Sequence, residues 1–224
     1  MAYSIINKKS PSSQNEMIAI VDYQAGNLTS VKRALDYLGY ESFITSDPEK
    51  VLKASRLIFP GVGAAGSAMA NLKRFGLDEA LREFFRLGRP MLGICLGIQI
   101  IFEQSEEDGV KGLGFLKGKV VRFPEPLYGS FGERLKVPHM GWNRVRKVRE
   151  HPLFEGIEED HEFYFVHSFF PVPEEVEVVI GLTEYGVEFT SAVAKFNLWA
   201  VQFHPEKSGR PGLKMLDNFL RWRG

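Results

Sequence analysis

The chain has 224 residues, of which 44% are hydrophobic and 25% are charged, a composition typical of a globular protein with a full core. Lys plus Arg and Asp plus Glu are equal at 28 each, so no excess positive charge favours nucleic acid as a partner. The single cysteine excludes an internal disulfide, and no apolar run approaches the roughly 20 residues of a membrane span.

The first 16 residues are polar, rich in Ser, Lys and Asn, and lack the apolar run of a secretory signal. We expect residues 1–16 to be a flexible tail or an expression remnant outside the fold. The lone cysteine and the missing signal favour a reducing compartment, so a cytoplasmic protein is expected. Residues 17–224 are expected to form a single domain.

From Met17 onward, short apolar runs alternate with segments of helical periodicity. This order predicts an α/β protein with a doubly wound, mostly parallel sheet of flavodoxin-like type and helices on both faces. Its site would lie beyond the carboxyl ends of the strands. The expected strands are 17–22, 41–45, 56–60 and 90–95, and the expected helices are 28–38, 64–74, 77–87 and 98–104.

The chain changes character after Gly112, where alternating apolar and polar residues replace the helical patterns. A mixed sheet or a small antiparallel β region is expected here, with a C-terminal helix at 212–222 packed on the sheet. The basic residues between 134 and 149 are expected to form a solvated face rather than a partner surface. The alternating segments are 119–123, 143–148, 162–169, 177–184, 188–196 and 197–203.

Residues 59–69 read FPGVGAAGSAM, in which Gly61, Gly63 and Gly66 match the G-x-G-x-x-G spacing of dinucleotide-binding loops. That function requires the glycines after the first strand and an acidic residue at the end of the second strand. Here the glycines follow the third predicted strand, and the acidic residue in range, Glu83, lies in a helix. The context therefore argues against an NAD-dependent oxidoreductase, and no cofactor is expected.

The lone cysteine, Cys95, lies at a predicted strand–helix junction between Gly93 and Gly97. This is the arrangement of a nucleophile elbow, in which a strained turn needs small neighbours and projects the nucleophile beyond the sheet. The positive end of the following helix favours the thiolate, and the N–H of Leu96 would face a developing oxyanion. A small buried cysteine is the alternative, but the flanking glycines favour a nucleophile.

Among the five histidines, only His204 lies at a predicted strand end with a carboxylate two residues on, in VQFHPEKSG. Pro205 favours an extended His204, and residues i and i+2 of an extended chain point the same way. Glu206 is therefore expected to orient the His204 ring as the base for Cys95. His167 ends an aromatic strand and is expected to pack or to bind backbone, and no zinc-ligand spacing occurs.

GICLGIQ, followed far downstream by FHPE, resembles the class I (triad) glutamine amidotransferases over nearly the whole chain from Met17. Two further segments, PGVG at 60–63 and VPHMGWN at 137–143, are similar to the glutaminase subunits of imidazole glycerol phosphate synthase, of histidine biosynthesis. The resemblance thus implies a glutamine amidotransferase fold and a glutaminase activity.

A triad of Cys95, His204 and Glu206 is the first implication of this resemblance. Cys95 would attack the side-chain amide of glutamine, and His204 would protonate the departing ammonia before water releases glutamate. The ammonia would pass to a cyclase subunit of (β/α)8-barrel type in a heterodimer. That subunit would make imidazole glycerol phosphate and an aminoimidazole carboxamide ribonucleotide.

The resemblance implies further site residues with supporting roles. The substrate contacts would be Gln99 and the backbone of Ser168 and Phe169. The partner interface would include His139, Met140 and Trp142.

The glycine-containing loop acquires a different role beside Cys95. An N–H around Gly61, Val62 or Gly63 would complete the oxyanion hole with that of Leu96, because glycines let these peptides change orientation. If that N–H points away at rest, a peptide flip triggered through the partner would switch the glutaminase on.

Two alternatives stay open on the sequence alone. Another class I amidotransferase or a free-standing glutaminase would use the same scaffold, and full activity without a partner would distinguish it. An inactive regulatory relative is the non-enzymatic alternative, and the intact triad argues against it.

Overall fold

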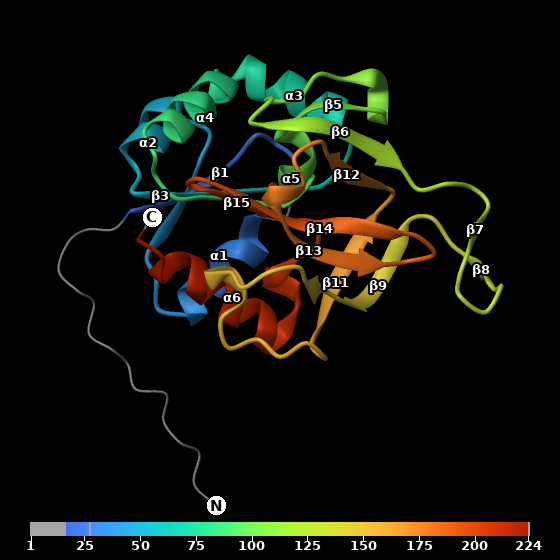
Figure 1. Cartoon of the computed structure of the whole chain (residues 1–224). Coiled ribbons are helices and arrows are strands. Elements are labelled where there is room, and N and C mark those ends of the chain that lie inside the picture. The colour runs from blue at the N-terminus through green and yellow to red at the C-terminus, as the bar shows by residue number, and fades with distance from the viewer. Residues whose placement is uncertain (1–16, 27, 224) are drawn as a thin grey trace, which may run out of the picture.

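The computed structural model describes residues 17–26 and 28–223, so the predicted tail of residues 1–16 lies outside the described residues (Figure 1). A central sheet of eight strands runs in the order β10-β13-β14-β15-β4-β3-β1-β2. Its strands are β1 (Ile18–Val21), β2 (Ser42–Thr45), β3 (Arg56–Gly61), β4 (Met91–Cys95), β10 (Arg146–Lys147), β13 (Val179–Glu184), β14 (Glu188–Lys195) and β15 (Leu198–Val201).

Five neighbouring strands of this sheet, β2, β1, β3, β4 and β15, pair in parallel, and β14, β13 and β10 continue it antiparallel. The parallel strands are short and apolar, as β1 (IAIV) illustrates with four buried residues. Because parallel strands point the same way, the carboxyl ends of β3, β4 and β15 meet at one edge of the sheet. The predicted mixed, mostly parallel sheet is confirmed.

The two faces of the sheet carry separate hydrophobic cores. Ile18 and Ile20 of β1 pack in one core with α1 and α6, whereas Ala19 and Val21 pack in the other with α2 to α5. Figure 1 shows α1 and α6 below the sheet and α2, α3 and α4 above it, which is the doubly wound arrangement that was predicted. The helices are α1 (Leu28–Tyr37), α2 (Pro48–Lys53), α3 (Ala65–Arg74), α4 (Leu77–Arg86), α5 (Leu96–Ile100) and α6 (Gly209–Arg221).

The remaining strands form small sheets beside the central one, in the half where antiparallel pairing was predicted. A three-stranded sheet has the order β12-β6-β5, a ribbon pairs β9 with β11, and a hairpin pairs β7 with β8. Their bounds are β5 (Phe102–Ser105), β6 (Leu116–Arg122), β7 (Leu127–Tyr128), β8 (Arg134–Leu135), β9 (His139–Arg144), β11 (Glu162–His167) and β12 (Phe169–Pro173). Short 3-10 helices lie at Glu107–Gly109 (η1), Pro152–Phe154 (η2), Val176–Val178 (η3) and Pro205–Lys207 (η4).

Part of the predicted helix 98–104 is wrong. The helix α5 ends at Ile100, and Phe102–Ser105 is strand β5, because the carbonyls of Ile100 and Ile101 accept hydrogen bonds from returning chain at Leu113 and Phe115. Helical hydrogen bonding cannot continue once those carbonyls are taken. No helix in the described part of the chain is long and apolar enough to cross a membrane.

The helix α2 and the break between β11 and β12 were not predicted. Asp47 caps α2 by accepting from the Glu49 N–H at 2.9 Å, and Pro48 occupies its first turn, which is a start signal legible in the sequence DPE. The predicted strand 162–169 is divided at Ser168, whose carbonyl accepts from Phe123 N–H at 3.0 Å.

Candidate active site

Cys95 is the last residue of β4 and turns the chain into α5. Its backbone has φ 55° and ψ −105°, which is strained for a residue with a side chain. The glycines two residues before and after Cys95 are closely packed: a Cβ at Gly97 would lie 2.4 Å from the Phe59 carbonyl oxygen, and one at Gly93 would lie 3.0 Å from Gly97. The turn therefore has the geometry of a nucleophile elbow at the carboxyl edge of the sheet.

His204 and Glu206 form a buried pair at the same edge. His204 Nδ1 lies 2.8 Å from Glu206 Oε1, and each side chain is 3% exposed. The backbone reason differs from the prediction, because Glu206 lies in the 3-10 helix η4 rather than in extended chain, and the turn brings it back to the ring. His204 is itself extended, and hydrogen bonds from its N–H to the Tyr164 carbonyl and from the Ser208 hydroxyl to its carbonyl hold it in place.

The charges around His204 favour an imidazolium. Burial lowers the pKa of His204, but the charges of a Cys95 thiolate and of the Glu206 carboxylate outweigh burial and raise this pKa to about 10. A carboxylate only accepts, so the Glu206 contact fixes a hydrogen on Nδ1. Among the described residues Nε2 is buried and contacts no nitrogen or oxygen within hydrogen-bond distance, and an interaction of the ring with the Cys95 thiol helps to raise its pKa. This nitrogen is left to exchange a proton with a reacting group.

The backbone N–H groups predicted to form the oxyanion hole differ in whether they already have a hydrogen-bond acceptor. Gly61 lies opposite Cys95 in the parallel pairing of β3 and β4, so the loop after Gly61 starts beside the nucleophile. Leu96 begins α5, where backbone N–H groups have no partner within the helix. The N–H of Val62, in contrast, donates to the Ala25 carbonyl at 3.1 Å. The Val62 donor is therefore engaged elsewhere and not available to an oxyanion.

The glycines of this loop are required by space and by backbone conformation. A Cβ at Gly61 would lie 2.0 Å from the Tyr23 hydroxyl, and Gly63 has φ +94°. Tyr23 is fully buried, and its hydroxyl has no hydrogen-bond partner in the described part of the chain. Burial and the charge of Cys95 raise the pKa of Tyr23. Tyr23 was not predicted at this site, because an aromatic residue after a strand carries no motif.

Two buried glutamines connect the nucleophile to β12. Gln99 Nε2 donates to the Phe169 carbonyl at 3.0 Å and to Gln202 Oε1 at 3.2 Å, and Gln202 Nε2 lies 3.9 Å from Cys95 Sγ. The predicted substrate contact Gln99 is thus 6% exposed and turned into the protein. Gln202 was missed, although its place two residues before His204 was a signal that could have found it.

The segment around Ser168 and Phe169 forms a wall near the nucleophile. The Val166 carbonyl oxygen lies 3.9 Å from Cys95 Sγ. The Ser168 carbonyl accepts from Phe123 N–H, and the Phe169 carbonyl accepts from the side chain of Gln99. Because these carbonyls have donors within the protein, a substrate contact by this backbone would use its N–H groups.

The three residues predicted at a partner interface separate into two groups. Met140 and Trp142 on β9 are 63% and 54% exposed, so an apolar surface is present on this ribbon. His139 is only 2% exposed and its ring stacks on Phe165 and Tyr185. Side chains alternate along a strand, so that of His139 faces inward, and its contact with a partner stays a prediction.

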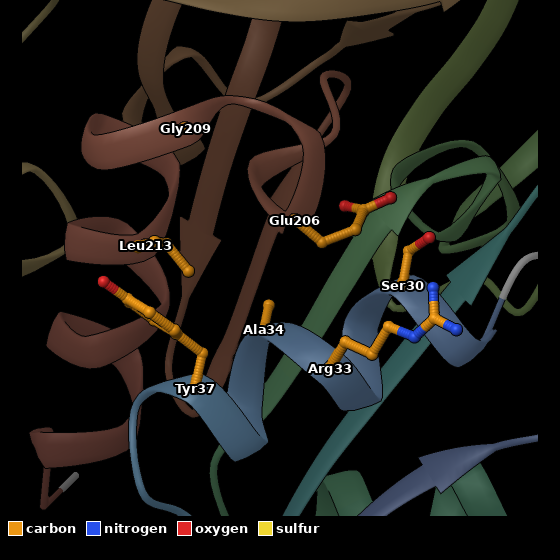
Figure 2. A pocket seen from close by; sticks show the side chains of 7 residues that line it. All are labelled: Ser30, Arg33, Ala34, Tyr37, Glu206, Gly209 and Leu213. Carbon is orange, nitrogen blue, oxygen red and sulfur yellow. The ribbon is translucent and has the colours of Figure 1, made fainter.

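A hollow of about 290 Å³ reaches the pair from its Glu206 end (Figure 2). Figure 2 shows the Glu206 carboxylate above Ser30 and Arg33 of α1, with Leu213 of α6 across the hollow. Cys95 and His204 are not among the residues that line it, so this hollow does not open onto Cys95. Within residues 17–26 and 28–223, no three His, Cys, Asp or Glu side chains gather as metal ligands.

The chain is similar to known proteins over most of its length. The chain matches the family "Glutamine amidotransferase class-I" over residues 19–222. It is 53% identical to imidazole glycerol phosphate synthase subunit HisH of Nitratidesulfovibrio vulgaris strain DP4 over 206 residues, which cover 92% of this chain and 96% of the relative. It is 52% identical to the subunit of the same name of Sulfurimonas denitrificans, over 92% of this chain and 99% of the relative.

Solved structures share the fold at much lower identity. PurLQS from Thermotoga maritima matches with a TM-score of 0.71 and 18% identity, covering 91% of this chain and 97% of that chain. The glutaminase domain of Trypanosoma brucei CTPS matches with a TM-score of 0.61 and 16% identity, covering 91% of this chain and 93% of that chain. At such identity the likeness shows the α/β fold alone.

Proposed function

The chain belongs to the class-I glutamine amidotransferases, as a glutaminase subunit of imidazole glycerol phosphate synthase, and we propose that Cys95, His204 and Glu206 carry its chemistry. The observation that carries the proposal is the 2.8 Å contact between His204 and Glu206 at the sheet edge where Cys95 occupies its strained turn. Residues 17–224 would form one amidotransferase domain.

Hydrolysis would proceed through a thioester. The Cys95 thiolate attacks the amide carbon of the glutamine side chain, and a tetrahedral oxyanion forms. His204 gives its proton to the leaving nitrogen, so ammonia departs and a glutamyl thioester remains. Water, losing a proton to neutral His204, then attacks the thioester and releases glutamate and the thiolate. Glu206 holds the imidazole in the tautomer and orientation that these transfers need.

The oxyanion would be stabilised by two N–H groups, from Leu96 and from Val62. Because the Val62 N–H donates to the Ala25 carbonyl, the loop would have to turn this peptide before the hole is complete. Gly61 and Gly63 on either side of Val62 permit such a turn. The isolated subunit would then waste little glutamine.

A cyclase partner would provide the trigger and consume the ammonia. In this proposal the partner is a (β/α)8-barrel subunit that forms a heterodimer with this chain in the cytoplasm. It would use the ammonia to convert a ribulosyl-formimino nucleotide to imidazole glycerol phosphate and aminoimidazole carboxamide ribonucleotide. The exposed Met140 and Trp142 on the β9 ribbon would belong to the surface that meets it.

Glutamate release measured with and without the cyclase subunit and its nucleotide ligand tests this proposal. We expect slow release by the isolated chain and strong stimulation by the partner with its ligand. Full activity of the isolated chain would instead support a free-standing glutaminase. Activity that no cyclase stimulates would point to a different ammonia acceptor.

A further inference from the structure

We propose that His139 and His167 are positioning residues that hold the glutamine-binding wall in place through a directional hydrogen-bond chain running from Asn143 to the Phe169 carbonyl. The inference rests on the proposed function, because it assigns these residues a role in binding glutamine. It also ties that wall to the β9 ribbon that carries Met140 and Trp142.

The register of the ribbon places the two histidines together. His139 and His167 are directly opposite in the antiparallel pairing of β9 with β11, so their side chains lie on one face of the ribbon. His139 Nδ1 lies 3.2 Å from His167 Nε2. Both side chains are buried. A buried imidazole pair needs every ring nitrogen accounted for, because an unpaired buried polar group is costly.

The positions of the ring hydrogens on His139 and His167 can be assigned from the end of the hydrogen-bond chain at the Phe169 carbonyl. A carbonyl oxygen only accepts, so His167 Nδ1, 2.8 Å from the Phe169 oxygen, must be the donor. In a neutral ring His167 Nε2 is then the acceptor, and His139 Nδ1 donates to it. His139 Nε2 is left as an acceptor. Both histidines are therefore hydrogen-bearing at Nδ1.

The outer end supplies the donor that this assignment requires. Asn143 Oδ1 accepts from the Arg144 N–H at 2.8 Å, which identifies the other amide atom as the NH₂ group. That group donates to the Glu184 carbonyl at 2.8 Å and lies 3.3 Å from His139 Nε2. The two ends, argued separately, give the same direction. The chain Asn143 to His139 to His167 to Phe169 is consistent throughout.

The surroundings keep both imidazoles neutral. The His139 ring stacks between Phe165 and Tyr185, with ring centroids at 4.9 and 4.0 Å. Burial lowers the pKa of His139 to about 4 and, aided by the nearby His139 and His204, lowers the pKa of His167 to about 3. A second hydrogen on either ring would set two N–H groups against each other or against the Asn143 NH₂. The hydrogen-bond chain therefore forms only when both imidazoles are neutral.

The inner end of the chain lies at the active site. The Phe169 carbonyl receives both His167 Nδ1 and Gln99 Nε2, so its two lone pairs are occupied and its peptide is fixed. The residue before His167, Val166, has its carbonyl oxygen 3.9 Å from Cys95 Sγ. Fixing this segment fixes the Ser168 and Phe169 N–H groups proposed to hold glutamine. Loss of the chain should therefore weaken glutamine binding more than the bond-breaking steps.

The ribbon end of the chain lies next to the proposed partner surface. Met140 is opposite Val166 and follows His139 directly in β9, and its side chain is 63% exposed. A partner that shifts β9 would thereby act on the same hydrogen bonds that hold Phe169. The wall and the partner surface are thus two ends of one connected element.

The test combines nitrogen NMR of the full chain with kinetics of the cyclase complex at saturating nucleotide ligand. His139→Phe breaks the hydrogen bonds from Asn143 to His167 but keeps an aromatic ring that can stack on Phe165 and Tyr185. His161→Phe, on a surface loop, is the matched control. We expect His139→Phe to raise the KM for glutamine roughly 5- to 30-fold with a much smaller change in kcat, and the control to leave both unchanged. His139→Gln, which retains a donor and an acceptor, should recover part of the KM.

Nitrogen NMR of the unaltered chain at neutral pH gives a readout that needs no variant to fold. We expect both His139 and His167 to carry their hydrogen on Nδ1, with Nε2 unprotonated. A hydrogen on Nε2 of either ring, or an unchanged KM in a folded His139→Phe protein, would overturn the inference. Retained activity of Cys95→Ala would overturn the proposed function instead, so the two failures are distinguishable.

Discussion

Cys95 and the Val62 peptide lie at the ends of adjacent parallel strands, yet the structure holds them very differently. Cys95 is buried in a turn between the closely packed Gly93 and Gly97, and the His204–Glu206 pair at the same edge is also buried. Val62 is 40% exposed between two glycines, and its N–H is bound to the Ala25 carbonyl. The side of the site with Cys95, His204 and Glu206 is assembled, whereas on the other side the Val62 N–H is not free to bind an oxyanion.

The Val62 side of the site is therefore the less costly one to rearrange. Moving Cys95 would disturb the buried core in which it packs, and moving His204 would disturb its buried contact with Glu206. Turning one peptide beside Gly61 and Gly63 exchanges a single hydrogen bond for another. The net contribution of one backbone hydrogen bond to stability is only about 1 kcal/mol. The binding energy of a partner can therefore offset the loss of such a bond. In the proposed mechanism, Cys95 and His204 therefore remain fixed while the Val62 peptide turns.

The largest effect is expected on the assembled side. Cys95→Ala removes the only group that can form the thioester, so glutamate release should fall by roughly 10⁴-fold or more. Circular dichroism and partner binding should be unchanged, because alanine fits the same turn with fewer atoms. Measurable glutaminase activity in this variant would place the nucleophile elsewhere.

Glu206→Gln should give the next largest loss. The amide keeps the size of the carboxylate but removes the negative charge beside His204 Nδ1, so the imidazolium loses stabilisation and kcat should fall by roughly 10³-fold. The pKa of His204, followed by NMR, should fall as well, since Glu206 is one of the groups that raise it. An unchanged kcat would remove Glu206 from the triad.

Gly61→Ala tests the unassembled side. The new methyl group would lie 2.0 Å from the Tyr23 hydroxyl, so the loop must shift, and partner-stimulated glutaminase activity should fall by roughly 10²-fold. Adding Tyr23→Phe removes the nearest clashing atom and should restore part of the rate. A double variant no better than Gly61→Ala would show that Tyr23 does not set the position of the loop.

The smallest expected effect is a pH dependence of stability from the buried histidines. The pKa values of His139 and His167 are lowered to about 4 and about 3, whereas an unfolded histidine titrates near 6.5. Below about pH 6.5 these two histidines bind protons in the unfolded chain but stay neutral in the native chain. The free energy of unfolding therefore falls as the pH falls, by up to about 1.4 kcal/mol per pH unit for each histidine.

Urea unfolding between about pH 6.5 and pH 5 measures this slope. His204 contributes little in this window, because its pKa is raised to about 10 and it is protonated in both states. His151, whose pKa is lowered to about 4, keeps its contribution in every variant. The slope of His139→Phe should be shallower than that of the unaltered chain. Equal slopes would mean that His139 is charged in the fold.

Much of the fold, and the positions of Cys95 and His204 at strand ends, could be predicted from the sequence for physical reasons. Cys95 between Gly93 and Gly97, and His204 before Pro205, are local patterns in which neighbours along the chain dictate the backbone. The end of α5 at Ile100 was not legible, because it depends on hydrogen bonds from Leu113 and Phe115 that fold back from later in the chain.

The supporting residues were hidden for the same reason. Tyr23 and Gln202 act through contacts with Gly61 and Cys95 that only the sheet order creates. The resemblance placed the segment of His139 at a partner interface, but it could not show that this side chain lies on the inward, buried face of β9. A sequence pattern gives the strand, but which of its two faces is covered depends on strands elsewhere.

The hydrogen bond from Val62 N–H to the Ala25 carbonyl is the most direct test of the difference between the two sides. NMR scalar coupling between the Val62 nitrogen and the Ala25 carbonyl carbon reports that bond alone. We expect the coupling to be present in the isolated chain and lost in the active complex with the cyclase and its nucleotide ligand. A coupling that persists in the fully active complex, or that is missing from an isolated chain of low activity, would contradict it.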